Sequence, residues 1–394
     1  MVLIVNVNNR KYVFSFSFIV GVLICFLILF SFILTYSDEL FYFNISKQIA
    51  KGLNPYIDFF FAHPLFQVIT LIPFSSSFFL LRSFSIMISL GSFFLFVKIS
   101  EKEFSKKSYF LLFSPFFLSF FHMGLGENFS LFFLFISYFF LLKNKESFAG
   151  FFFSIAFFSR YISLLFFPLF FSQTKRKLNF FRSFFLFSFF FFLFHFFIGG
   201  FSFLEDTFLY HSSKIGFSSF YFFKNYLVLS LFPLLFIFLE KIKEGRIFYL
   251  FFVDSIMLFF FKKAFITYFI ISNAFIFLFI SKYVKKEHVF LLFLTLFFAF
   301  KPVVFYHSHN SLFSELDSFF KDKQGSVVFG DPLLVNYLNY SQNISVYGNF
   351  FDSFSSEMSD IDEDNPPDFI ISTSIMDNEV RVFNSFDVHT FELT

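Results

Sequence analysis

The sequence predicts an α-helical membrane protein that crosses the bilayer about eleven times and carries a small α/β domain at its C-terminus. Two observations lead to this prediction. Of the 394 residues, 57% are hydrophobic and only 15% are charged, and the mean hydropathy is +0.72. An ordinary soluble domain does not need that much apolar surface. The apolar residues, 92 of them Phe, also gather in long runs separated by short polar loops.

Each of these runs is a candidate membrane helix, which needs ~20 apolar residues or fewer where helices are short or bent. The run pair 148–159 and 161–172 is too short for two full crossings, so we interpret it as two short helices that meet at Arg160. The expected spans are 13–36, 78–97, 108–123, 128–142, 148–159, 161–172, 183–199, 220–239, 247–261, 264–281 and 288–305.

The distribution of Lys and Arg predicts the orientation of these spans, because basic loops stay on the cytoplasmic side. With the spans above, six basic clusters fall on one side: Arg10–Lys11, Lys98–Lys107, Lys143–Lys145, Lys175–Arg182, Lys241–Arg246 and Lys282–Lys286. We therefore expect a multi-pass protein of the cell membrane. Its other, extracytoplasmic side would carry the loops that hold Asp38, Glu127, Arg160, His211 and Lys262, together with the tail.

The first outer loop, 37–77, is predicted to begin with a helix from about Glu39 to Lys51. Asp38 can cap this helix, and Gly52 can end it. Apolar residues on one face and polar residues on another predict that the helix lies flat on the outer surface of the membrane.

The tail, residues 306–394, differs in character from the membrane part, 1–305. It carries three cations against fifteen carboxylates, about −12, whereas the preceding part carries about +14. This split favours opposite sides of a membrane over nucleic-acid binding. Strand-like runs at 327–329, 344–347 and 369–372, with a short helix at 333–340, predict a small acidic α/β domain. The lone Cys25 excludes an intramolecular disulfide.

The polar residues of the outer face suit a reaction with an anionic lipid. A carboxylate can accept a proton from an attacking hydroxyl, and cations can hold a phosphate and stabilise the charge that it gains on leaving. The set is Asp38, Glu39, Asp58, His63, Glu127, Arg160, Tyr161, Glu205, Asp206, His211, Lys214, Lys262 and Lys263. No Cys/His spacing supports a zinc site, so we assign no metal ligands.

Each of these residues also has a structural interpretation. Asp38 could act only as a helix cap, Asp58 could be a solvated loop residue, and His63 could serve the turn before Pro64. Arg160 is the hardest to explain structurally, because it interrupts a strongly apolar stretch. His195 is interpreted as a packing residue and not as a ligand.

Two segments resemble the GT-C glycosyltransferases, in particular the protein mannosyltransferase-like family (family-39 glycosyltransferases) and its aminoarabinose-transferase relatives. The first segment is Asp38-Glu39, Tyr42, Gly52, Pro55-Tyr56-Ile57-Asp58-Phe59 and His63-Pro64-Leu65, with one Pro where many relatives have two. The second runs from Ala149-Gly150 through Ser159-Arg160-Tyr161 to Pro168, with Ser in place of Thr. Glu127, Tyr210-His211 and Lys262-Lys263 with Tyr268 match more loosely.

The resemblance implies a GT-C-like inverting glycosyltransferase that moves a sugar from a polyprenyl or dolichyl phosphate to a protein, glycan or lipid acceptor outside the cytoplasm. It requires no cofactor and is compatible with a divalent cation. By position, Asp38 would be the catalytic base and Glu39 its substitute. Tyr42, Asp58, Glu127, Tyr161, His211 and Tyr268 would line the donor and acceptor pocket, and His63, Arg160, Lys214, Lys262 and Lys263 would bind the phosphate.

The alternatives are a membrane transporter or lipid-carrier flippase, and an inactive relative of the same superfamily. Transporters commonly place charges near the middle of the bilayer and show related halves. In this sequence the ionisable residues gather at one predicted face, and no related halves are visible. This favours the enzyme, while the identities of the sugar and the acceptor stay open.

Overall fold

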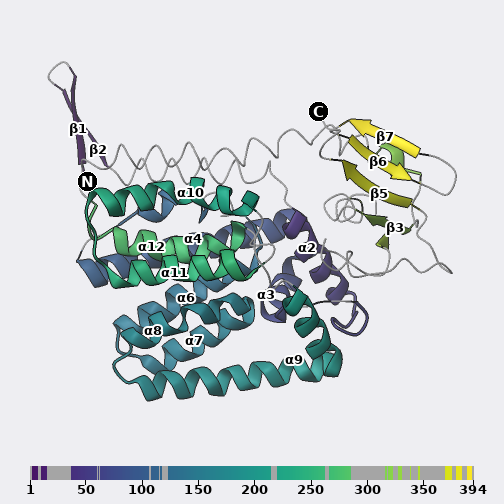
Figure 1. The fold of residues 1–394 in the computed structure, drawn as a ribbon, viewed down its shortest axis with the longest axis horizontal. Helices are drawn as coiled ribbons and strands as arrows, with labels where there is room; N and C mark the ends of the chain where they lie inside the picture. Colours follow the sequence, from purple (N-terminus) through teal and green to yellow (C-terminus); the bar gives the residue numbers. More distant parts are fainter. Residues whose placement is uncertain are drawn as a thin grey trace. The chain divides into compact units, whose positions relative to one another are not determined.

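The computed structural model describes the chain in parts, which Figure 1 shows as ribbons. The described residues are 2–7, 10–15, 37–59, 61, 63–105, 108–114, 116–117, 123–213, 220–261, 266–284, 316, 318–322, 327–330, 338, 345–346, 369–374, 379–383 and 388–392. They belong to two compact units, Met1–Leu34 and Thr35–Thr394.

The first unit contains a β-hairpin that the sequence did not predict. Strand β1 (Val2–Val7) pairs antiparallel with β2 (Arg10–Ser15), with Val2 opposite Ser15 and Val7 opposite Arg10. The predicted start of the first span at residue 13 is therefore wrong, because residues 13–15 belong to β2. The rest of that span, 16–36, lies outside the described residues.

The described part of the second unit is mainly helical, as predicted. Most expected spans coincide with a helix, and the run 220–239 matches one end to end. The helices are α2 (Ser37–Ala50), α3 (Leu65–Leu71), η1 (Ile72–Phe74), α4 (Phe78–Phe104), η2 (Phe110–Phe113), α6 (Gly126–Leu142), α7 (Glu146–Ser159), η3 (Tyr161–Phe166), α8 (Phe167–Gln173), α9 (Lys177–Ser213), α10 (Phe220–Leu239), α11 (Gly245–Phe260), η4 (Ile266–Tyr268) and α12 (Phe269–Ile280).

Two helices in the described part are long and apolar enough to cross a membrane: α4, and the part of α9 from Lys177 to Thr207. Shorter apolar helices include α6, α7 and α12. Within the expected span 108–123, residues 110–113 form only the 3₁₀ turn η2, and 118–122 lie outside the described residues, as does the whole span 288–305.

The centre of the helical part is built on close packing of α7 against α6 and α9 (Figure 1). Gly150 makes the approach of α9 possible: a Cβ atom there would lie 2.4 Å from the Phe180 carbonyl oxygen. The Ser154 hydroxyl donates to the Phe184 carbonyl across the same contact, at 3.0 Å. Helix α9 bends at Gly200, whose φ of 56° and ψ of −137° favour glycine.

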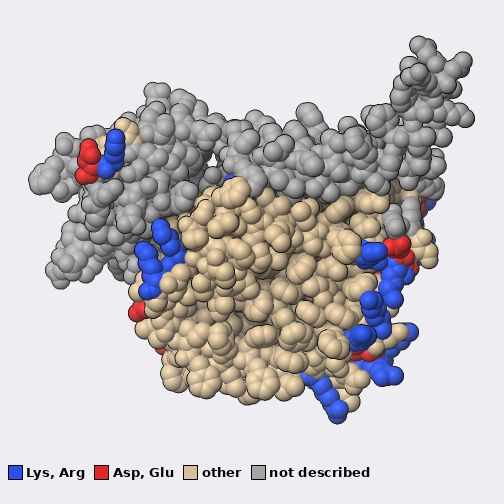
Figure 2. All heavy atoms as spheres, turned by 180° about the vertical axis from the view of Figure 1, so that it is seen from behind, with Lys and Arg blue, Asp and Glu red and all other residues tan. Residues whose placement is uncertain are grey.

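Most of the basic clusters meet at one end of these helices. The Arg246 guanidinium pairs with Glu103 and with Glu244, and the Tyr283 hydroxyl donates to Glu244 at 3.2 Å. These contacts join the polar ends of α4, α11 and α12. Figure 2 shows a group of Lys and Arg side chains along one edge of the helical part.

The C-terminal strands form a five-stranded sheet in the order β4-β3-β5-β6-β7. Strands β3 (Val327–Gly330), β4 (Ser345–Val346) and β5 (Phe369–Ser374) pair in parallel, while β6 (Glu379–Phe383) and β7 (Val388–Glu392) add antiparallel. The first three lie where strands were predicted. Of the helix expected at 333–340, the structure describes only Leu338, and the α/β domain as a whole stays a prediction.

The contact at Gly150 gives a first prediction. Replacing Gly150 with Leu should lower the free energy of unfolding by ~1–3 kcal/mol or more, because the side chain would force α7 and α9 apart. Thermal unfolding of the purified protein in detergent measures this loss. Gly245→Leu is the matched control, because a Cβ atom at Gly245 meets no atom within 4 Å. Equal stability of the Gly150 and Gly245 variants would contradict the packing described here.

Candidate active site

Helix α2 carries the first predicted site residues, and it is more deeply buried than its sequence suggests. Asp38 lies within the helix and not before it, so the prediction that it occupies the N-cap is wrong. Asn44, on the face expected to be polar, is fully buried, and so is Ser46. Residues 39–46 of α2 are all buried, so this part of the helix belongs to the core and does not lie on a surface. Gly52 ends the turn that follows with a φ of 94°, as predicted.

The segment after Gly52 folds back through a series of hydrogen bonds. The exposed Asp58 carboxylate accepts from the Asn54 amide at 2.6 Å, which gives Asp58 the role of a turn residue in this structure. The Tyr56 hydroxyl donates to the His63 carbonyl at 2.8 Å. Burial raises the pKa of the Tyr56 phenol well above its usual range, so it keeps the proton with which it holds His63.

Helix α9 anchors the same segment from the other side. The Phe61 amide donates to Asp206 Oδ2 at 3.1 Å, and the Leu65 amide donates to His195 Nε2 at 2.9 Å. His195 Nδ1 in turn lies 2.6 Å from the Phe191 carbonyl, so the ring is the Nδ1–H tautomer. His195 is thus a structural residue that positions the loop, as the sequence suggested.

Glu39 forms a buried ion pair with Arg82 of α4. Arg82 Nε donates to Glu39 Oε1 at 3.1 Å, and Nη2 contacts Oε2 at 2.5 Å. Glu39 is 0% exposed and Arg82 is 2% exposed. Two parallel bonds fix both side chains, so Glu39 has a structural role that competes with the expected catalytic one. Arg82 was not among the residues predicted from the sequence, although a guanidinium in the first turns of an apolar run already signals a buried partner.

Arg160 lies where the two short helices meet, as predicted. It is extended, with φ −155° and ψ 120°, between the end of α7 and the start of η3. Its Nε lies 3.1 Å from Glu127 Oε1, and its Nη1 lies 2.9 Å from His63 Nδ1. The guanidinium also lies 5.5 Å from the centre of the Tyr42 ring. Four expected site residues from four segments therefore meet in one place.

Glu127, in the first turn of α6, is 0% exposed. Its Oε1 also faces the Thr267 hydroxyl at 3.4 Å, whereas its Oε2 is buried with no hydrogen-bond partner among the described residues. Such an oxygen is costly to bury and is available to accept a hydrogen bond from a ligand. Glycine at position 126 keeps the space open, because a Cβ atom there would lie 2.8 Å from Arg160 Nε and from Gln67 Oε1.

The remaining expected residues divide into two groups. Tyr161 packs on Phe157 and Phe158, and its hydroxyl lies close to Thr207 of α9. Tyr268 is half-buried beside Phe261, and its neighbour Thr267 is the residue that faces Glu127. Lys214, Lys262 and Lys263, and the side chains of Asp38 and His211, lie outside the described residues.

Within the part of the chain that the structure describes, no group of three His, Cys, Asp or Glu side chains is arranged to hold a metal ion. No protein-family model, curated protein or solved structure matches the chain. A buried guanidinium, an unsatisfied carboxylate oxygen and a neutral imidazole suit a ligand that is anionic at one end and carries hydroxyl groups at the other.

The Arg160–Glu127 pair gives a second prediction. Each single variant, Arg160→Met or Glu127→Gln, should lower the free energy of unfolding by ~3–5 kcal/mol, because it leaves a buried charge without its partner. The loss of unfolding free energy in the double variant should be smaller than the sum of the losses in the two single variants, by at least ~1 kcal/mol. Chemical denaturation of the four proteins measures this coupling. The control is Glu127→Gln combined with Lys98→Met, two sites without a shared contact, whose effects should add; additive losses at 127 and 160 would mean that the pair does not form.

Proposed function

We propose that the chain is an inverting membrane glycosyltransferase that moves a sugar from a polyprenyl or dolichyl phosphate to an acceptor outside the cytoplasm. The observation that carries the proposal is the meeting of Arg160, Glu127, His63 and Tyr42, which are far apart in the sequence. Two of the four come from the loop segment that resembles the GT-C enzymes, and a third comes from the Arg160 segment.

Arg160 is proposed to bind the phosphate of the donor. A guanidinium can form two parallel hydrogen bonds to phosphate oxygens, and these bonds gain strength where water is scarce. His63 Nδ1 accepts from Arg160, so its Nε2 carries the proton and is a hydrogen-bond donor. Glu127 Oε2 is proposed to accept a hydrogen bond from a hydroxyl of the sugar or the acceptor.

The helical period of α2 favours Asp38 over Glu39 as the general base. Residues four apart share a side of a helix, so Asp38 falls on the side of Tyr42, which faces Arg160. Glu39 falls on the side of Phe43, whose ring packs on Phe78 beside Arg82. Position 38 thus lies toward the proposed phosphate site, and position 39 lies toward α4.

The separation of charge supports the proposed membrane orientation. The Arg160 site lies at the first turn of α6, whereas Arg246 contacts Tyr138 near the last turn of the same helix. We propose that the end with the basic clusters faces the cytoplasm and that the Arg160 site and the acidic C-terminal domain face outward. An outward site is where a lipid-borne donor and an extracytoplasmic acceptor can meet.

Transfer of sugar by purified protein tests the function directly. The protein is incubated with several polyprenyl-phosphate sugars, and candidate acceptors are examined by mass spectrometry. Asp38→Asn should lower turnover by a factor on the order of 10² to 10⁴ with donor binding largely kept, because the attacking hydroxyl loses its proton acceptor. Glu101→Gln, at an exposed i,i+3 pair with Lys98, is the matched control and should keep the parental rate. An unchanged rate in Asp38→Asn would show that Asp38 is not the base. If none of the tested donors gave any sugar transfer, that result would argue against the proposed function.

Donor binding gives a separate prediction for Arg160. Arg160→Lys keeps the charge but loses the planar pair of donors, so the affinity for the donor should fall by about tenfold or more. Arg182→Lys makes the same change at an exposed position and should leave the affinity unchanged. Titration with a fluorescent polyprenyl-phosphate sugar measures both. Equal affinity of the folded Arg160→Lys variant and the parent would take Arg160 out of the phosphate site.

A further inference from the structure

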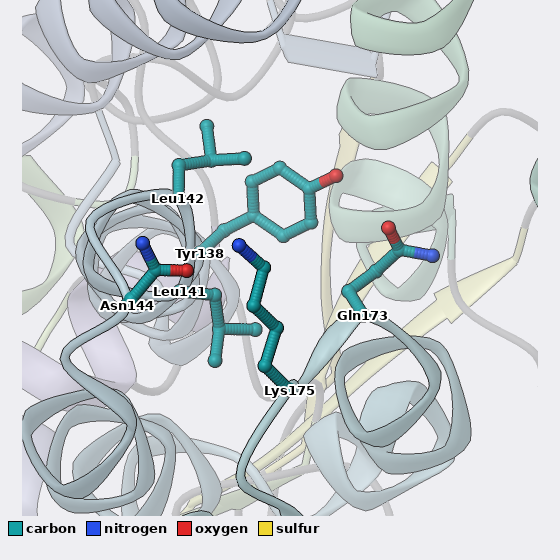
Figure 3. A pocket seen from close by; sticks show the side chains of 6 residues that line it. All are labelled: Tyr138, Leu141, Leu142, Asn144, Gln173 and Lys175. Atoms are coloured by element: carbon teal, nitrogen blue, oxygen red, sulfur yellow. The ribbon is translucent and has the colours of Figure 1, made fainter.

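A small pocket opens at the other end of α6, among the basic clusters. It has a volume of ≈ 190 Å³ and is lined by Tyr138, Leu141, Leu142, Asn144, Gln173 and Lys175. Figure 3 shows the Lys175 side chain rising between Asn144 and Gln173 toward the ring of Tyr138. The volume holds a phosphate-sized group with its hydration, and it is too small for a whole lipid or nucleotide.

The charge of Lys175 is not neutralised within the part of the chain that the structure describes. None of the six lining residues is a carboxylate, and no ion pair of Lys175 is found there. The nearby cations differ: the Lys143 ammonium lies 4.2 Å from the Phe139 ring centre, and the Lys177 ammonium lies 5.3 Å from that of Phe171. Among these cations, Lys175 is therefore the one that lines the pocket.

The carbonyls and dipoles at the nearby helix ends do not explain why a positive charge lies at position 175. Two carbonyls in the last turn of α6 already accept hydrogen bonds: Phe140 O from the Lys143 and Lys145 amides, and Leu141 O from the Asn144 amide. The Phe171 carbonyl of α8 accepts from the Thr174 amide in the same way. The C-termini of α6 and α8 and the N-termini of α7 and α9 come together at this end, so their dipoles largely offset one another.

We propose that this pocket binds the phosphate group of an anionic ligand, in the first place the headgroup of an anionic phospholipid. The Lys175 ammonium supplies the charge, and the Asn144 and Gln173 amide groups supply neutral donors on either side. Leu141 and Leu142 form an apolar wall that suits the first methylene groups of the acyl chains. Basic pockets between membrane helices on the cytoplasmic side bind lipid headgroups in this way. The proposal does not depend on the enzymatic function.

The test uses the full-length protein in two arms. In the first, protein extracted from vesicles of phosphatidylcholine and phosphatidylglycerol is examined by native mass spectrometry for retained phosphatidylglycerol. In the second, protein in phosphatidylcholine alone is titrated calorimetrically with inorganic phosphate. Lys175→Ala should lower retention about tenfold, and Lys175→Arg should restore most of it. Lys177→Ala, which removes an exposed cation two residues away, should retain phosphatidylglycerol like the parent.

Each outcome decides the proposal. Loss in the first arm that is specific to Lys175→Ala supports a lipid headgroup, and loss in the second arm alone supports a free phosphate in the same pocket. Equal loss in Lys175→Ala and Lys177→Ala would show general surface charge and overturn the pocket, as would no loss in either arm. Gln173→Leu provides a second variant that keeps every charge and should weaken the same binding, and thermal unfolding checks that each variant is folded.

Discussion

The arrangement of the helical part depends on the need to pair charges that are buried among apolar helices. An unpaired guanidinium or carboxylate in such surroundings costs several kcal/mol. Arg82 therefore ties α4 to α2 through Glu39, and Arg160 ties the end of α7 to α6 through Glu127. These two pairs fix the first loop against three helices, and His63 joins the second pair directly. Because the pairs are buried, this end of the helical part is held by charge as well as by packing.

The two ends of α6 then acquire different chemistry. Glu127 stands in its first turn, and Tyr138 lies eleven residues further, ~17 Å at 1.5 Å per residue. At the first end a carboxylate and a guanidinium are buried together. At the second, Arg246 bonds to Glu103, Glu244 and Tyr138, while exposed lysines surround the pocket. Between these two ends α6 carries mainly apolar side chains, most of them Phe.

The sequence predicted those features that a short stretch of chain determines by itself. The break at Arg160, the stop at Gly52 and the helix 220–239 follow from local composition and glycine conformation. The burial of α2 does not, because it depends on the packing of α2 against α3 and η1, which no pattern within α2 reveals. The pairing of Glu39 with Arg82 also escaped, since the two residues are separated by 43 positions. The hairpin β1–β2 was hidden by the strong apolar signal that follows it.

The charge balance of the Arg160 site indicates what the site still needs for a phosphate. Arg160 and Glu127 neutralise each other, so a phosphodiester, which carries one negative charge, would be left uncompensated by this pair. Desolvating an uncompensated anion is costly, and a further cation is the direct remedy. Lys214 directly follows the described end of α9, and Lys262 and Lys263 follow the end of α11. We propose that one of these lysines, which the resemblance assigns to phosphate binding, supplies that additional cation.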